Sequence, residues 1–282
     1  MSNARLQQHA DYSEQAQHYA HGHDSALTLR QHAGRTATTQ GAFFLPHLQR
    51  GMCVLDCGCG VGSITLGLAG AVAPGQVTGI DVSDVAIEQA RASAVQQKVA
   101  NALFQLGDAC NLAFPDGLFD AVFSHNVLEH LDDPLRALIE MRRVLKLGGV
   151  IGIRGSDMGG NLLAPPEGLW HQWSAIYEDD WRSVAGDSRF GRRVSGLLRE
   201  AGFTDIQASA SYEVYGDIDA RRLVSEIAAS RCRESDFVGR IVASGRASPE
   251  TLEAMRTAWL AWAERPDAFF AIAHGEAVGR KA

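Results

Sequence analysis

A carboxylate followed by glycines at alternate positions is the first feature of this sequence that could bind a ligand. Asp56 comes after an apolar run, and Gly58, Gly60 and Gly62 follow it before helical spacing of apolar residues begins. Glycine lets the backbone turn sharply and lets a ligand approach closely, so the segment predicts a strand, a tight turn and a helix that Ser63 caps. The glycines alone leave a plain strand-to-helix turn open as the alternative.

Further polar side chains occur at the ends of three other predicted strands. Asp81 and Asp108 end two of them, and the tripeptide Ser124-His125-Asn126 ends a third. Helical segments alternate with these strands, which is typical of a parallel sheet covered on both faces. Such sheets bind ligands at the carboxyl ends of their strands, so we expect these side chains to converge with the glycine turn on one edge. The predicted strands lie around 54–57, 76–83, 104–108, 119–124 and 150–154.

The position of Asp56 separates two kinds of nucleotide site. A pyrophosphate binds a helix N-terminus through amide groups and the helix dipole, and a carboxylate at the start of the turn would repel it. The dinucleotide fingerprint also has two residues between its last glycines, where this chain has only Val61. S-adenosylmethionine has no phosphate and carries an ammonium and a sulfonium group, so it fits this turn better.

Five motifs in this order resemble those of the class I S-adenosylmethionine-dependent methyltransferases, in the branch that includes the ubiquinone/menaquinone methyltransferases. The resemblance covers about residues 52–153. It implies an α/β fold, a Rossmann-like seven-stranded sheet with its last strand antiparallel, and S-adenosyl-L-methionine as the cofactor. The motifs are Val54-Leu55-Asp56-Cys57-Gly58-Cys59-Gly60-Val61-Gly62, Gly79-Ile80-Asp81-Val82-Ser83, Gly107-Asp108-Ala109, the run from Phe119 through Ser124-His125-Asn126 to Leu131, and Arg143-Val144-Leu145-Lys146-Leu147-Gly148-Gly149.

The resemblance also implies which residues bind the cofactor. The glycine turn and Asp56 would hold the methionine end, Asp81 the ribose hydroxyls, and Asp108 with the Ala109 amide the adenine, on whose face Val82 would pack. The segment after the fourth strand would lie beside the sulfur atom. The predicted cofactor-binding residues are therefore Asp56, Gly58, Cys59, Gly60, Asp81, Val82, Asp108, Ala109, Ser124, His125 and Asn126.

The rest of the chain is expected to cover this site. The segment between the last two strands must start at the edge where the cofactor binds, and the aromatic segment after the fifth strand leaves from the same edge. Both would form a mostly helical lid together with the polar N-terminal segment. The predicted organisation is an N-terminal helical flap at 1–45, a cofactor-binding core at 46–156, a loop-rich, aromatic-rich lid insertion at 157–190, a core helix and strand at 191–215, a helical lid insertion at 216–266 and the last strand at 267–282.

Methyl transfer needs few catalytic groups. It is an in-line displacement on an activated methyl group, so the protein supplies alignment, exclusion of water and in some cases a base. His125 is the first candidate for the base, with His171 and Tyr19 as alternatives. No metal is expected, because the resemblance places the tripeptide 124–126 where metal-dependent relatives have a carboxylate.

Residues after the fifth strand are candidates for binding the methyl acceptor. Trp170, Trp173 and Tyr177 could contact an apolar or aromatic acceptor, or they could only pack the lid onto the core. Arg154, at the end of the fifth strand, could pair with an acidic group of the acceptor or form a structural ion pair. Both alternatives stay open at this point.

The composition of the chain disfavours some classes of binding partner and some cellular locations. A net charge of −7 and a pI of 5.8 disfavour broad attraction to nucleic acid or to an anionic membrane. Five cysteines without zinc-site spacing suggest reduced thiols, and a polar start without a signal core predicts a cytoplasmic protein. No apolar run approaches the roughly 20 residues of a membrane span.

We therefore expect a methyltransferase that methylates an oxygen, nitrogen or carbon atom of a small, cyclic or lipophilic metabolite. A methyltransferase of a protein or an RNA base is one alternative, which would need an exposed basic or peptide-binding face. A non-catalytic module that binds S-adenosylmethionine is another, and Asp56 disfavours an NAD-dependent oxidoreductase. Nothing in the sequence indicates an oligomeric state.

Overall fold

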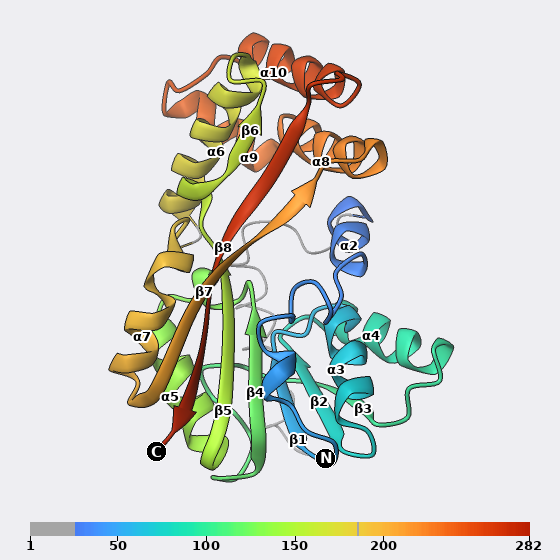
Figure 1. Cartoon of the computed structure of the whole chain (residues 1–282). Helices are drawn as coiled ribbons and strands as arrows, with labels where there is room; N and C mark the ends of the chain where they lie inside the picture. The colour runs from blue at the N-terminus through green and yellow to red at the C-terminus, as the bar shows by residue number, and fades with distance from the viewer. Residues whose placement is uncertain (1–25, 185) are drawn as a thin grey trace, which may run out of the picture.

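The computed structural model describes residues 26–184 and 186–282, which form a sheet-based core below a group of helices (Figure 1). Helix α2 (Ala26–Ala33) is the first described element. The first 25 residues of the predicted N-terminal flap, which include Tyr19, lie outside the described residues.

Within the described residues, five parallel strands form the centre of the core. β1 and β4 are buried along most of their length, as expected for parallel strands covered on both faces. Leu55 pairs with Thr78 on one side and with Val122 on the other. The strands are β1 (Cys53–Cys57), β2 (Gln76–Asp81), β3 (Ala102–Leu106), β4 (Phe119–His125) and β5 (Leu145–Ser156), in the spatial order β3-β2-β1-β4-β5.

Two long antiparallel strands connect the core with the helices above it (Figure 1). β7 (Phe203–Tyr215) and β8 (Phe269–Lys281) each span 13 residues. β8 pairs antiparallel with β5 on one side and with β7 on the other. The predicted Rossmann-like sheet with an antiparallel last strand is therefore confirmed.

A short additional strand makes the described sheet eight-stranded instead of the predicted seven-stranded. β6 (Leu162–Ala164) pairs antiparallel with Phe269–Ala271, the first residues of β8. The pairing of β5 with β8 ends at Ser156 and His274, so the edge of β8 beyond that point is open to another strand. An open strand edge exposes backbone N–H and C=O groups. β6 forms hydrogen bonds with these groups at the start of β8 and so covers the edge.

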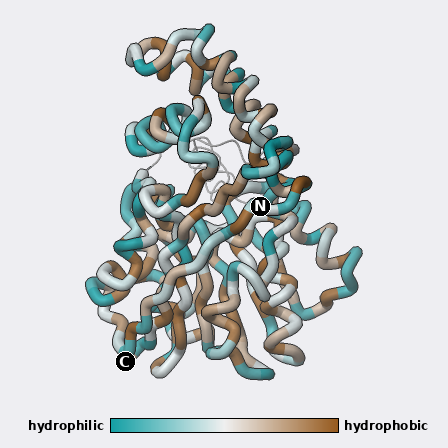
Figure 2. The backbone as a smooth tube through the Cα atoms, turned by 45° about the horizontal axis from the view of Figure 1, so that its top comes forward, coloured by the Kyte–Doolittle hydropathy of each residue, from teal (hydrophilic) through white to brown (hydrophobic). Residues whose placement is uncertain are grey.

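Helices cover both faces of the central strands, along which hydrophobic stretches run in Figure 2. One face packs against Phe44 and the two helices that follow β1 and β2. The other packs against the helices that precede β5 and β7. These helices are α3 (Ser63–Val72) and α4 (Asp84–Gln96) on the first face, and α5 (Pro134–Val144) and α7 (Val194–Glu200) on the second.

Side chains cap α4 and α5, whereas the cap predicted for α3 is absent. The side chains of Ser83 and Asp133 each accept a backbone N–H in the first turn of α4 and α5. The prediction that Ser63 caps α3 was wrong, because Gly62 occupies the N-cap position. The Ser63 hydroxyl instead donates to the His32 carbonyl oxygen at 2.8 Å, which ties α2 to the start of α3.

The lid consists of four described helices with a hydrophobic core of their own. Trp259 and Trp262, at the centre of that core, are at most 1 % exposed. The predicted helical stretch between the last two strands forms α8 (Ile218–Arg231), α9 (Ser235–Ala243) and α10 (Pro249–Trp262), and α6 (Leu169–Val184) joins them.

Helix α6 corrects the prediction of a loop-rich segment after β5. It has 16 residues, and Trp170, Trp173 and Trp181 on it are buried. Together with Tyr177, these aromatic side chains recur every three or four residues, which is the spacing of one helix face. The sequence therefore contained a helical periodicity that predicts α6. In the described residues, no helix is both long and apolar enough to cross a membrane.

Candidate active site

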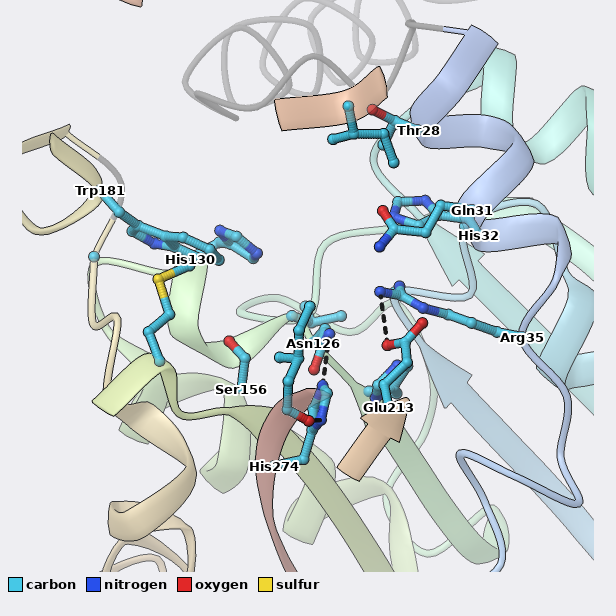
Figure 3. Close-up of a pocket in the computed structure, with 18 of the residues that line it drawn as sticks. Thr28, Gln31, His32, Arg35, Asn126, His130, Ser156, Trp181, Glu213 and His274 are labelled. Carbon is cyan, nitrogen blue, oxygen red and sulfur yellow. Dashed lines mark hydrogen bonds and ion pairs between the residues drawn. The ribbon is translucent and has the colours of Figure 1, made fainter. Parts of the chain in front are cut away.

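A cavity of about 1980 Å³ lies at the carboxyl ends of the parallel strands, below the lid (Figure 3). Its walls come from α2, the turn after β1, the ends of β2 and β4, and helices α6 and α8. Ten of the eleven predicted cofactor-binding residues line it, namely Asp56, Gly58, Cys59, Gly60, Asp81, Val82, Asp108, Ala109, His125 and Asn126.

The glycine turn has the geometry that requires glycine. Gly58 and Gly60 have φ values of 74° and 52°, in the left-handed region. A Cβ atom on Gly58 would lie 2.1 Å from Cγ2 of Val127, so the turn and the segment after β4 pack closely. A Cβ atom on Gly60 would meet nothing within 4 Å, which leaves open space for a ligand above this residue.

Asp81 ties this turn to the end of β2. One carboxylate oxygen accepts the Gly60 N–H at 2.9 Å, and the other accepts the Ser83 N–H at 3.0 Å. Asp108 has a similar local bond, because its Oδ1 accepts the Cys110 N–H at 2.7 Å. Both carboxylates are thereby fixed in direction at the cavity wall.

Asp56 is the most deeply buried carboxylate of this edge. It is 2 % exposed and accepts a hydrogen bond from the Thr65 hydroxyl at 2.6 Å. Burial raises the pKa of Asp56 to about 7, the Thr65 hydrogen bond opposes that rise, and the charge of Asp81 adds to it. A buried carboxylate of this kind favours a cationic ligand group, so the turn suits an amine and disfavours a phosphate.

Ser124 is the one predicted cofactor-binding residue that does not line the cavity. Its side chain is 1 % exposed and its hydroxyl donates to the Cys57 carbonyl oxygen at 2.9 Å, so it ties β4 to β1. Asn126, two residues later, has a φ of 52° and lies at the floor of the cavity in Figure 3.

His125 is packed against a buried ion pair. Its Nδ1 lies 3.4 Å from Nη1 of Arg154, and Nε of Arg154 donates to Oε1 of Glu276 at 3.0 Å. Arg154 is 2 % exposed and does not line the cavity, so its geometry matches the structural ion pair that the sequence left open. Burial, followed by the charges of Arg35 and Arg154, holds the pKa of His125 well below its usual range.

Sequence reasoning missed His274, which lies beside His125 with a ring-centroid distance of 5.7 Å. Its Nδ1 lies 3.1 Å from the Ile272 carbonyl oxygen, and its Nε2 lies 3.4 Å from Nδ2 of Asn126. A carbonyl oxygen only accepts, so Nδ1 carries the proton and Nε2 accepts from the amide. His274 could have been predicted from the antiparallel pairing of the last strand, because that pairing brings its first residues to the edge where the parallel strands end.

Arg35 and Glu213 are a second pair that the sequence did not reveal. Arg35 follows α2 and Glu213 lies on β7, and Figure 3 marks the ion pair between them. Nη2 of Arg35 lies 3.5 Å from Oε2 of Glu213. Nearby, Nε2 of Gln31 donates to the Tyr215 hydroxyl at 2.5 Å. The segment that carries α2 is thus joined to the strand that supports the lid.

The other predicted catalytic and acceptor residues occupy different places. His171 lines the cavity, but its Nε2 lies 2.8 Å from the Pro165 carbonyl oxygen and donates to it. Trp173 and Tyr177 also line the cavity, with their rings stacked at 4.8 Å. Trp170 does not line it and donates its indole N–H to the same carbonyl of Pro165. Within 26–184 and 186–282, no group of three His, Cys, Asp or Glu side chains is arranged to hold a metal.

Known proteins resemble this chain over most of its length. A family described as "Methyltransferase domain" matches residues 55–153. An uncharacterised methyltransferase of Schizosaccharomyces pombe is 30% identical over 94% of this chain and 96% of its own length, and a demethylmenaquinone methyltransferase of Geobacillus is 31% identical over 66% and 84%. The solved YcgJ protein from Bacillus subtilis has the same fold, with a TM-score of 0.59 at 19% identity over 86% of this chain and 97% of its own. This chain belongs to the class I S-adenosylmethionine-dependent methyltransferases.

Proposed function

We propose that this enzyme methylates an oxygen, nitrogen or carbon atom of a small, lipophilic or cyclic molecule. The observation that carries the proposal is the upper part of the cavity, which continues from the cofactor edge into an apolar chamber beneath the lid. Cavities that combine an apolar wall with a few polar groups bind small organic molecules. The apolar residues that line the chamber are Leu162, Leu163, Val224, Ile227, Ala228, Phe269, Phe270 and Ile272.

The residues at the strand ends fit S-adenosylmethionine, which supplies an activated methyl group when bound. The buried carboxylate of Asp56 suits its ammonium group, and Asp81 and Asp108 offer acceptor oxygens to its hydroxyl and amino groups. The open space above Gly60 admits the ligand. None of these groups would suit a phosphate, which the methyl donor lacks.

The lid contributes by shaping the chamber and excluding water. β7 and β8 are continuous from the core into the lid, so the chamber walls are fixed relative to the strand ends. Trp173 and Tyr177 line the cavity with their rings stacked on each other, and an aromatic wall suits a flat or apolar acceptor. Alignment of the acceptor with the methyl group is the main catalytic contribution that such walls make.

The proposal can be tested with labelled S-adenosylmethionine and three sets of acceptors: lipophilic small molecules, peptides and RNA. We expect label to enter the small molecules. Ile227→Arg, which places a charge in the apolar chamber, should reduce that transfer by roughly tenfold or more, because an unpaired charge is costly to bury. Glu226→Arg, an exposed neighbour on the same helix, should leave it unchanged. Labelling of peptide or RNA alone, or equal transfer by both variants, would contradict the proposal.

Binding of S-adenosylhomocysteine is expected to weaken as the pH falls below about 7, the pKa of Asp56. The ligand ammonium attracts the carboxylate but not the carboxylic acid, so affinity is full above this pKa and falls by up to about tenfold per pH unit below it. Calorimetry at several pH values measures the effect. Asp56→Asn should bind weakly with no such pH dependence, and a wild-type affinity that is the same on both sides of this pKa would show that Asp56 does not face the ammonium.

A further inference from the structure

Among the described residues that line the cavity, several buried N–H groups lack a hydrogen-bond partner, including the indole N–H groups of Trp173 and Trp259. Two of these groups belong to basic side chains, Nε2 of His125 and Nε of Arg35, and both atoms are buried. His125 is 6 % exposed and the Arg35 side chain is 13 % exposed, and both residues line the cavity. An unsatisfied buried polar group is costly, so a pair of them in one cavity points to a ligand that completes their bonds.

The neighbours of His125 fix which of its nitrogens carries the proton. Arg154 is always protonated and its guanidinium only donates, so Nδ1 of His125 must offer its lone pair to Nη1 at 3.4 Å. The proton of the neutral ring is therefore on Nε2, the atom without a partner. His125 accordingly presents a donor at the cavity, and it has no free lone pair with which to act as the base that the sequence suggested.

The surroundings of these donors favour a negatively charged acceptor. The charges of Arg35 and Arg154 both act on His125, and they also help to keep His274 neutral. Oε1 of Glu213 accepts from the Tyr215 hydroxyl, while its Oε2 forms an ion pair with Nη2 of Arg35 at 3.5 Å but accepts no hydrogen bond from a described residue. Glu276 is bonded by Arg154, so neither carboxylate accepts from Nε2 of His125 or Nε of Arg35. An ammonium ion, which has no lone pair, would not satisfy them.

We propose that His125 and Arg35 form an oxyanion-binding subsite for the methyl acceptor. Its ligand is an ionised phenol, enol or carboxylic acid whose oxygen accepts from Nε2 of His125 and Nε of Arg35, while the rest of the molecule occupies the apolar chamber. The subsite rests on the proposed function, since it narrows the small molecule to one with an acidic oxygen. Arg154 and Glu276 act as positioning residues, because they set the tautomer of His125.

The direct test uses 4-nitrophenol, whose ionised form is coloured, and nitrobenzene as the matched compound without the acidic oxygen. Both are titrated into the full chain saturated with S-adenosylhomocysteine. We expect the nitrophenolate to bind at least roughly tenfold more tightly than nitrobenzene and the pKa of the bound phenol to fall, because a hydrogen bond to a charged group is strong. Equal affinity of the two compounds would overturn the subsite.

Variants assign the effect to the two donors. His125→Phe and Arg35→Met should each weaken nitrophenolate binding by roughly tenfold and leave nitrobenzene binding unchanged. Glu213→Gln should have the opposite effect and tighten nitrophenolate binding severalfold, because it removes the charge that offsets Arg35. His47→Phe and Arg30→Met, which do not line the cavity, are the matched controls and should change nothing. A Glu213→Gln variant that fails to tighten binding would count against the subsite even if His125→Phe is unstable.

The outcomes separate this inference from the proposed function. Transfer of label to neutral amines or alcohols, with no preference for acidic oxygens, would overturn the subsite while the small-molecule function stands. Transfer to peptide or RNA alone would overturn the small-molecule function, whatever the nitrophenol titration gives. In each case, a cooperative urea unfolding transition of the same sample confirms that the variant is folded.

Discussion

Replacing Asp81 with alanine is expected to weaken S-adenosylhomocysteine binding by about a hundredfold or more. Its two carboxylate oxygens are held by the Gly60 and Ser83 N–H groups at the end of β2, where they can accept both ribose hydroxyls. Charge-assisted bonds are worth about 1.5–3 kcal/mol each, and two of them account for a loss of this size. Calorimetry with S-adenosylhomocysteine measures it directly.

Two comparison variants show whether the loss belongs to the ribose bonds. Asp81→Asn keeps an acceptor oxygen and should bind with intermediate affinity. Asp84→Ala removes an exposed carboxylate three residues later, which does not line the cavity, and should bind normally. If Asp81→Ala instead binds within a few-fold of the unchanged protein, the assignment of Asp81 to the ribose is wrong.

The cofactor edge could be predicted from the sequence because its signals are local. A glycine turn after a strand, and an acid at the end of each following strand, are defined by residues close together in the chain. Parallel topology then forces those strand ends to meet at one edge. Asp56, Asp81 and Asp108 accordingly line one cavity, while Ser124 points away from it because alternate side chains of a strand face opposite sides.

The floor of the cavity could not be predicted in the same way, because its contacts join distant parts of the chain. Asn126 meets His274 across 148 positions, and Arg154 meets Glu276 across 122. Both contacts depend on the register of β5 against β8, which no local pattern encodes. Arg35 meets Glu213 for the same kind of reason, since the segment after α2 crosses over to β7.

The role of His125 shows how tertiary contacts change the chemistry that a residue type suggests. A histidine at the end of the fourth strand is a reasonable candidate for a base when only the sequence is known. Arg154 then takes up its lone pair, and the ring becomes a hydrogen-bond donor at neutral pH. Arg154, on the neighbouring strand, therefore determines whether His125 acts as a base or as a hydrogen-bond donor.

The buried pair of Arg154 and Glu276 is the basis of the largest stability effect that we expect. The two side chains are 2 % and 6 % exposed, and the hydroxyl of Ser209 donates to Oε2 of Glu276 at 2.9 Å. Glu276→Ala leaves the buried guanidinium of Arg154 without the carboxylate that it bonds, although the charge of Glu213 still acts on it, and should lower the free energy of unfolding by about 3–5 kcal/mol. Urea denaturation measures the change. Glu264→Ala, which breaks the exposed ion pair with Arg222, should leave stability almost unchanged.

The double variant Arg154→Met/Glu276→Leu distinguishes the two tasks of this pair. Replacing both charges by apolar side chains of similar size removes the unpaired charge, so most of the lost stability should return. His125 then has no obligate donor at Nδ1, and its proton is free to move between the ring nitrogens. We therefore expect the double variant to be stable yet still deficient in binding 4-nitrophenolate. Recovery of both stability and nitrophenolate binding would mean that the pair only stabilises the sheet. If Glu276→Ala is as stable as Glu264→Ala, the pair does not contribute to stability either.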